Sequence, residues 1–199
     1  MAEVGSVPCV GALGEGDLAS VAPAGSAPPV LQIYAAPGKR WVEAAVRSAE
    51  AAGFGAICLT VDTPVYGRRE RDLENGFRLP PPPVDPTFSA DPAAEQAGVT
   101  WDYVDWLRSI SRLPICLKGI RLPEDALLAI EHGVEVVWLS NHGGRQLDHE
   151  PATLTLLPEV VDAVGGRARV VFDGGVQRGS DVIKALALGA DLVAVGKLQ

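Results

Sequence analysis

The chain has 199 residues, 47% of them hydrophobic, and a formal net charge of −8, which disfavours a nucleic-acid partner because phosphate binding needs clustered lysine and arginine. No apolar run approaches the roughly 18 residues that a membrane-spanning helix needs, and the first residues lack the basic and apolar regions of a signal peptide. The length and the hydrophobic content predict one domain over residues 1–199.

Short apolar runs along the chain have the composition of β-strands. In chain order they are PCVGAL (8–13), VLQIYA (30–35), GAICLTV (55–61), LPICLKG (113–119), VEVVWLS (134–140), RVVFDGG (169–175) and DLVAVG (191–196). Most of them are apolar throughout and do not alternate, as expected for strands that are covered on both faces.

Helical patterns lie between several of these runs, at 39–53, 121–133 and 178–189, and each ends at a glycine. The alternation predicts an α/β fold with a parallel sheet, either doubly wound or closed into a (β/α)8 TIM barrel. In both architectures the active site lies at the carboxyl ends of the strands. Polar residues gather at these ends: Tyr34, Thr60, Asp62, Lys118, Ser140 to Arg145, and Asp173.

Residues 62–100 interrupt this rhythm with a long connection that contains four successive prolines. A connection of this length is typical of a functional lid or an insertion. We find neither an internal repeat nor a linker that would mark a second domain.

The cysteine content indicates a reducing compartment. The three cysteines are odd in number, and Cys58 and Cys116 lie inside apolar runs, so we expect buried thiols and no disulfide framework. No Cys/His spacing is typical of a zinc site, so no metal is predicted. A cytoplasmic protein is the expectation.

The stretch SNHGGRQLD (140–148) is the strongest candidate for chemistry. It places a titratable imidazole, His142, three residues before the guanidinium of Arg145, with two glycines that allow close approach of a ligand. Such a pair can move a proton while it holds a carboxylate. The alternatives are a surface-turn histidine and a local ion pair between Arg145 and Asp148.

Other candidates also have structural interpretations. Asp62 either takes part in a site or forms an Asx-turn before Pro64. Lys118 ends an apolar run and needs an anionic partner, since an unpaired buried charge is costly. The segment DGGVQRGSD (173–181) joins a strand to a helix N-terminus, which favours phosphate, although glycine-rich loops are weak signals alone. We interpret His132 and His149 as structural or surface residues.

Together these motifs resemble the FMN-dependent 2-hydroxy-acid dehydrogenases and oxidases, such as glycolate oxidase, lactate oxidase and mandelate dehydrogenase. The matching stretches are QIY (32–34), AICLTVDTPVYGRRERDLENGFRLP (56–80), LPICLKGI (113–120), SNHGGRQLD (140–148) and FDGGVQRGSDVIKALALGADLVAVGK (172–197). They occur in the order found in that family.

The resemblance implies oxidation of a small L-2-hydroxy acid, such as L-lactate or glycolate, to the 2-oxo acid, with FMN as cofactor. His142 would be the base on the α-carbon or its hydroxyl, and Asp62 would support the imidazolium. Tyr34 would hydrogen-bond the substrate oxygen, and Arg69 and Arg145 would hold the carboxylate. FMN would be bound by Gln32, Thr60, Lys118, Ser140, Asp173, Gly174, Gly175, Val176, Gln177, Gly196 and Lys197. Oxygen, quinone and cytochrome stay open as electron acceptors, and a homo-oligomer is expected.

The sequence also departs from the family pattern. The chain begins near the expected second barrel strand and stops soon after Lys197, so we expect an incomplete barrel without the first strand and the last helix. Gly11 stands where the family has a hydroxyl residue, and Gln177 and Lys197 stand where it has arginines. The alternative hypothesis is therefore a catalytically silent relic that no longer retains FMN. A different phosphate-binding barrel enzyme, such as an isomerase, is a third hypothesis.

Overall fold

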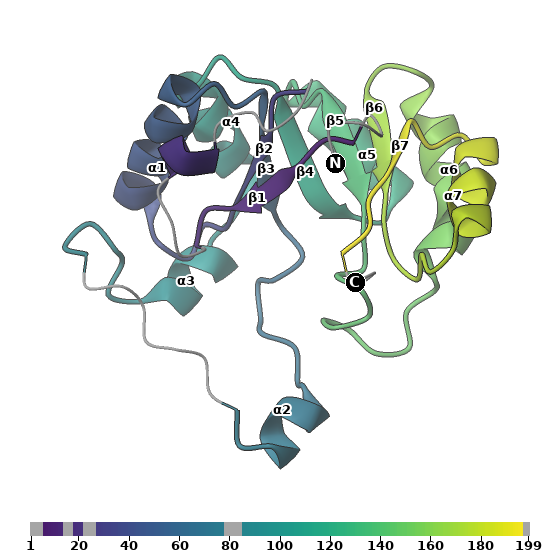
Figure 1. Ribbon diagram of the computed structural model, residues 1–199, viewed down its shortest axis with the longest axis horizontal. Helices are drawn as coiled ribbons and strands as arrows, with labels where there is room; N and C mark the ends of the chain where they lie inside the picture. Colours follow the sequence, from purple (N-terminus) through teal and green to yellow (C-terminus); the bar gives the residue numbers. More distant parts are fainter. Residues whose placement is uncertain (1–5, 14–17, 22–26, 78–84, 197–199) are drawn as a thin grey trace.

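The computed structural model describes residues 6–13, 18–21, 27–77 and 85–196, and its strands form one seven-stranded parallel sheet (Figure 1). The strands are Cys9–Gly11 (β1), Val30–Ile33 (β2), Ala56–Thr60 (β3), Ile115–Ile120 (β4), Val136–Leu139 (β5), Arg169–Phe172 (β6) and Leu192–Val193 (β7). Each strand pairs with the next one along the chain. A doubly wound sheet would reverse its strand order, so the sequential order confirms the predicted TIM barrel, here a partial one that is open between β1 and β7.

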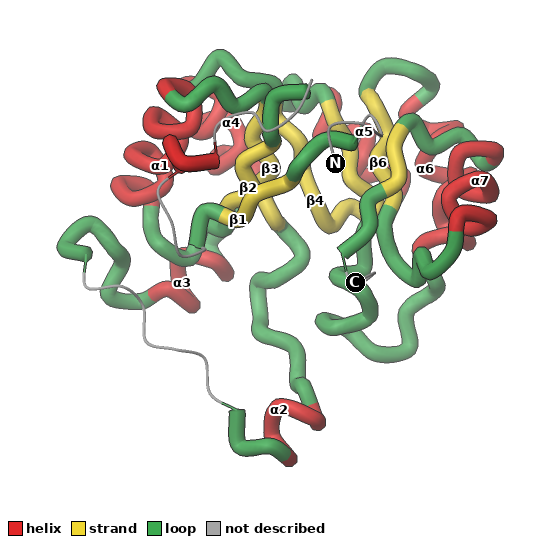
Figure 2. Tube along the Cα trace, in the orientation of Figure 1, coloured by secondary structure: helices red, strands yellow, loops and turns green. Residues whose placement is uncertain are grey.

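Helices cover the outer side of this sheet, as Figure 2 shows for α1, α4, α6 and α7. The α-helices are Lys39–Ala51 (α1), Glu70–Glu74 (α2), Pro92–Ala97 (α3), Trp101–Ile110 (α4), Pro123–Glu131 (α5), Thr153–Val164 (α6) and Gly179–Ala187 (α7), and Leu18–Val21 form a 3-10 helix. Within the described part of the chain, no helix combines the length and the apolar character needed to cross a membrane.

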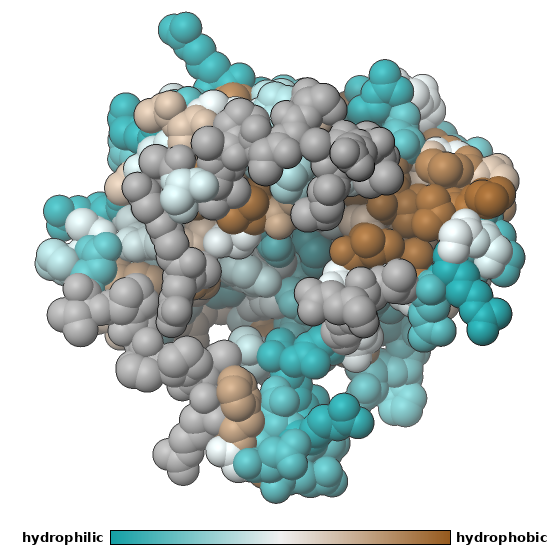
Figure 3. Space-filling model, in the orientation of Figure 1, coloured by the Kyte–Doolittle hydropathy of each residue, from teal (hydrophilic) through white to brown (hydrophobic). Residues whose placement is uncertain are grey.

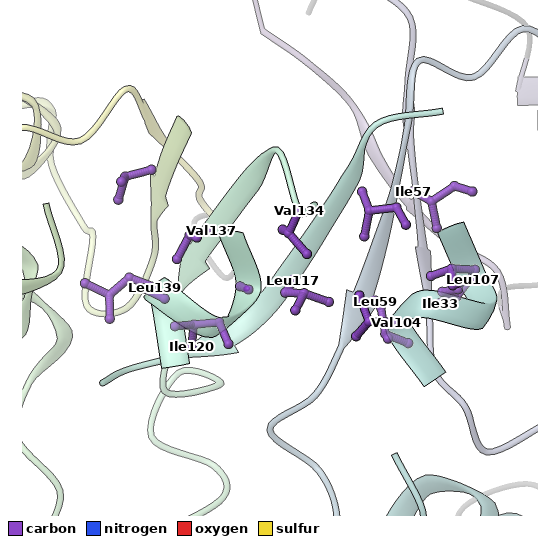
Figure 4. Packing of buried hydrophobic residues seen from close by; sticks show 14 of the residues in the cluster. Ile33, Ile57, Leu59, Val104, Leu107, Leu117, Ile120, Val134, Val137 and Leu139 are labelled. Atoms are coloured by element: carbon purple, nitrogen blue, oxygen red, sulfur yellow. The ribbon is translucent and has the colours of Figure 1, made fainter. Parts of the chain in front are cut away.

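The strands send alternate side chains to two different environments, because successive residues of a strand point to opposite faces. Ile33, Ile57 and Leu59 face the helices and lie beside Val104 and Leu107 of α4 (Figure 4). The opposite face carries a smaller apolar cluster that consists of Cys58, Cys116, Trp138 and Val171. This second face is the interior of the barrel, and the two buried thiols that the sequence predicted lie on it.

The two edges of the sheet are short strands. β1 has three residues and pairs only with β2, and β7 has two residues and pairs only with β6. Apolar side chains are exposed on and around α7 and β7, where Figure 3 shows a brown area at the right: Ile183, Leu186, Leu188, Leu192 and Val195. The structure thus has the open sheet edges that the sequence predicted.

Candidate active site

A row of polar side chains lines the interior of the barrel one step beyond the apolar cluster, toward the carboxyl ends of the strands. It consists of Gln32, Thr60, Lys118, Ser140 and Asp173. The last four each lie two residues after a member of the apolar cluster, and Gln32 pairs in register with one member, Cys58. Gln32 Nε2 donates a hydrogen bond of 3.0 Å to Thr60 Oγ1. The pleat of the strands therefore brings these five predicted FMN-binding residues to one surface.

His142 and Asp62 form the central pair of the site. The Nδ1 atom of His142 lies 2.9 Å from Oδ1 of Asp62, although 80 residues separate them in the chain. The two side chains are 18% and 8% exposed. An ionised carboxylate only accepts hydrogen bonds, so Nδ1 carries the proton and Nε2 is free to take another. This contact decides against a plain Asx-turn role for Asp62.

A bulge in β4 makes room for Asp62. The pairing of β4 with β5 shifts register between Lys118 and Ile120, and Gly119 between them has φ of +113°. A Cβ atom on Gly119 would lie 2.5 Å from the Cβ of Asp62. Only glycine combines this backbone conformation with so close an approach.

Lys118 has the anionic partner that its buried position requires. Its Nζ donates to Ser140 Oγ at 3.1 Å and lies 3.8 Å from Oδ2 of Asp173. Trp138 Nε1 donates to the same carboxylate oxygen at 3.0 Å. Burial raises the pKa of Asp173, although Lys118, Ser140 and Trp138 each act to lower it. The other oxygen, Oδ1, is buried and makes no hydrogen bond to the described residues.

Tyr34 is a half-buried residue at the end of β2. Burial raises the pKa of its hydroxyl above 10.0, and the negative charge of Asp62 raises it further, while a hydrogen bond with Thr60 opposes both effects. The hydroxyl therefore stays protonated and can donate a hydrogen bond near the His142–Asp62 pair.

Arg69 and Arg145 converge on one carboxylate. Asp72 of α2 places its Oδ2 atom 3.9 Å from Nη1 of Arg69 and 3.9 Å from Nη2 of Arg145. The guanidinium of Arg69 also lies over the ring of Tyr66, at 4.4 Å from its centroid. Arg145 thus pairs with Asp72, and the alternative partner Asp148 is wrong. The geometry shows that one anionic group can face both arginines.

The predicted phosphate loop follows β6. Gly174 and Gly175 have φ values of +105° and +72°, and Gln177 is exposed. The carboxylate of Asp181 accepts hydrogen bonds from the backbone N–H groups of Gln177 and Arg178, at 3.1 and 3.0 Å. Val176 and Gly196 also lie among the described residues, whereas Lys197 lies outside them.

Sequence reasoning did not identify three residues that organise this edge. Gln96 of α3 is buried, accepts hydrogen bonds from Ala35 N and Ala36 N, and donates to Thr60 O, so part of the predicted lid is anchored to the sheet. Asp72 bridges the arginines, and Gln146 binds the backbone of the segment that follows Asp62. Asp72 and Gln146 had a sequence signal, which is their place inside the matching stretches 56–80 and 140–148, and Gln96 had none.

Comparison with known proteins identifies the family of the chain. The sequence profile described as FMN-dependent dehydrogenase matches residues 1–199. The chain belongs to this family. It is 44% identical over 185 residues to an L-lactate oxidase of Nostoc sp., 48% over 181 residues to a peroxisomal (S)-2-hydroxyacid oxidase of Arabidopsis thaliana, and 47% over 184 residues to a glycolate oxidase of Oryza sativa. These matches cover 84% of this chain and 51%, 50% and 50% of the relatives.

Solved structures of mandelate oxidase share the fold. One has a TM-score of 0.85 at 39% identity and another, bound to (S)-mandelic acid, has a TM-score of 0.85 at 40% identity. The superpositions cover 98% of this chain and 57% and 56% of those chains. This member of the FMN-dependent dehydrogenase family thus spans about half the length of the curated relatives it matches.

The inner surface of the partial barrel carries polar groups of the kind that bind a flavin and its ribityl chain. The unpartnered Oδ1 of Asp173 can accept a hydrogen bond from a ribityl hydroxyl, and Lys118 offers a buried ammonium. Thr60, Ser140 and Gln32 add side-chain donors and acceptors on the same surface. The residues present therefore fit the cofactor of the family.

Proposed function

We propose that this chain oxidises a small L-2-hydroxy acid to the 2-oxo acid with FMN as the cofactor. The observation that carries the proposal is the His142–Asp62 pair at 2.9 Å, on the same edge of the barrel as the converging Arg69 and Arg145. The relatives act on L-lactate, glycolate and (S)-2-hydroxy acids according to their names, and these compounds share a carboxylate beside a carbinol carbon.

Arg69 and Arg145 bind and orient the substrate in this mechanism. Asp72 marks a position where a carboxylate faces both guanidinium groups. A substrate carboxylate that takes the place of Asp72 between the two arginines is fixed in direction, because guanidinium groups match carboxylates in a planar geometry. Orientation of this kind lowers the entropic part of the barrier.

His142 removes the proton. Since Nδ1 donates to Asp62, Nε2 accepts a proton from either the α-carbon or the hydroxyl of the substrate, and Asp62 stabilises the imidazolium that results. Tyr34, whose hydroxyl stays protonated, donates to the substrate oxygen. Lys118, Thr60, Ser140 and Asp173 would hold FMN, which would supply the acceptor for the two electrons and the second hydrogen that the substrate loses.

The experiment begins with the visible absorption spectrum of the purified chain, before and after addition of FMN. We expect flavin absorbance that bleaches under anaerobic conditions when L-lactate, glycolate or (S)-mandelate is added. A His142→Gln variant should bind FMN and reduce it roughly 10²–10⁴-fold more slowly. Protein that carries no flavin absorbance once free FMN has been removed would refute the proposal. An undiminished rate of flavin reduction in His142→Gln would refute the assigned base.

The second candidate is a chain that keeps the fold but does not retain FMN. It is favoured by Gln177, which is exposed and uncharged on the loop that would receive the phosphate. A phosphate dianion gains more from a charged partner than from an amide. The same titration with FMN separates the two candidates, because only the first gives a yellow protein.

A further inference from the structure

Gln146 makes three hydrogen bonds that the proposed mechanism does not use. Its Nε2 donates to the carbonyl oxygens of Asp62 and Val65, both at 3.0 Å, and its Oε1 accepts from the N–H of Gly67 at 3.3 Å. One carboxamide therefore satisfies three backbone groups of the segment 62–67, which leads from β3 toward α2.

The backbones of the two segments are in direct contact around this side chain. A Cβ atom on Gly67 would clash with the carbonyl oxygen of Arg145 and would lie 3.0 Å from the Cα of Gln146. Gly67 thus allows the segment 62–67 to pack on the His142 loop, and the carboxamide of Gln146 joins the two. In Figure 1 both segments leave the sheet on the side where α2 lies.

Gln146 and His142 hold the same residue from the same loop. His142 contacts the side chain of Asp62, and Gln146 contacts its main-chain carbonyl. Thr63 is buried, whereas the following Pro64, Val65 and Tyr66 are exposed, so side-chain burial fixes only the start of this segment. The position of the Asp62 carboxylate therefore also depends on the polar contacts of Gln146 and on the space at Gly119.

We propose that Gln146 is a positioning residue whose carboxamide docks the segment 62–67 on the His142 loop and so sets the Asp62–His142 hydrogen bond. Its importance for catalysis rests on the proposed function, in which His142 is the base. Its effect on His142 can be measured without flavin or substrate. A merely structural role would lower stability and leave the imidazole unchanged.

The primary experiment is nitrogen NMR of the protein with 15N-labelled histidine. The His142 signals are assigned by their loss in His142→Gln. In the wild-type chain we expect neutral His142 to carry its proton on Nδ1, because Asp62 accepts there. In Gln146→Ala the Asp62 contact weakens, so the Nε2 signal should move toward that of a protonated ring nitrogen.

Two further variants test the same contact. Gln146→Glu keeps the length and the acceptor for Gly67 but loses both donors, and Gly67→Ala disturbs the packing from the opposite side. Both should shift the His142 signals in the direction of Gln146→Ala. The matched control is Glu50→Ala. Glu50 accepts hydrogen bonds from Ser111 Oγ and Arg112 N, which are remote from the candidate site, so its loss should leave the His142 signals unchanged.

Unchanged His142 signals in any folded Gln146 variant would overturn the proposal. Hydrogen exchange in the wild-type chain provides a test that needs no variant. The Gly67 amide should be protected by its hydrogen bond to Gln146, and exchange at the rate of an unprotected amide would also overturn the proposal.

In FMN-loaded protein we expect Gln146→Ala to reduce flavin on the order of 10²-fold more slowly. If the wild-type chain binds no FMN, the NMR outcome still decides the role of Gln146, so the two failures are distinguishable.

Discussion

Tyr34 illustrates how burial prepares a single residue for its proposed task. Burial and the charge of Asp62 raise the pKa of its hydroxyl, so the hydroxyl keeps its proton above the ordinary tyrosine value of 10.0 and remains a donor. We expect Tyr34→Phe to slow flavin reduction about 10-fold, which corresponds to about 1.4 kcal/mol for one lost hydrogen bond. The rate should have the same pH dependence in both proteins below pH 10, as measured by stopped-flow absorbance. An alkaline decline that is present in the wild type and lost in the variant would contradict this.

Residues at strand ends could be predicted from the sequence because the edge of a parallel sheet collects them. Asp62, Lys118 and His142 each follow an apolar run, and the structure places all three at that edge. Asp72 and Gln146 lie inside the matching stretches 56–80 and 140–148, but their roles could not be predicted. Their partners are a pair of arginines and a set of backbone groups, respectively, and such contacts leave no pattern in the sequence.

At the scale of elements, the β4 bulge decides whether Asp62 reaches His142. We expect Gly119→Ala to lower the free energy of unfolding by roughly 1–3 kcal/mol, because alanine is strained at φ of +113° and its Cβ would overlap Asp62. It should also disturb the His142 nitrogen signals. Gly53→Ala is the control, since Gly53 has φ of +81° and nothing within 4 Å of an added Cβ. An intact His142 signal in a folded Gly119→Ala protein would contradict the expected displacement of Asp62.

The strands were predictable as elements, whereas four of the seven α-helices in the described residues were not. Each of the seven apolar runs overlaps one strand, and each strand is shorter than its run, although β4 extends one residue beyond its run, to Ile120. α2, α3, α4 and α6 were not among the predicted helices. α6 contains Pro158, and a proline inside a helical pattern normally indicates a helix end. α3 lies inside the predicted lid, where the hydrogen bonds of Gln96, which no sequence pattern reveals, attach it to β2 and β3.

Across the whole molecule, the two ends of the barrel have different tasks. The carboxyl ends carry the candidate active site, and the amino ends are joined by carboxylates that accept strand N–H groups: Glu135 binds Ile115 N at 2.8 Å and Asp191 binds Val170 N at 2.7 Å. The β/α alternation was sufficient to predict the parallel sheet but left the barrel and the doubly wound sheet as alternatives. The strand order, which only the structure shows, selects the partial barrel.

Glu135, at the amino ends of the strands, makes the stability of the fold depend on pH in the acid range. Burial raises its pKa, but hydrogen bonds from Arg108 and from Ile115 N outweigh burial and hold the pKa below 4.5. A carboxylate whose pKa is lower in the folded state than in the unfolded state stabilises the fold at every pH above the unfolded-state pKa. This stabilisation is lost as the pH falls through the folded-state pKa. Glu135→Gln should therefore lower the free energy of unfolding at pH 7 by about 1 kcal/mol, a figure discounted for its half-exposed position.

The difference between Glu135→Gln and the wild type should shrink as the pH falls below 4.5 and should vanish below the lower folded pKa of Glu135, where both side chains are uncharged. Urea unfolding at a series of pH values measures it. Glu43→Gln is the matched control, because Glu43 pairs with Arg47 four residues along the same exposed helix face and, among the described residues, joins no second element. Since Glu135 connects Arg108 of α4 with the start of β4, its loss should act on the whole cooperative unit. A difference that persists unchanged at low pH would show that the Glu135 charge is not what stabilises this end of the barrel.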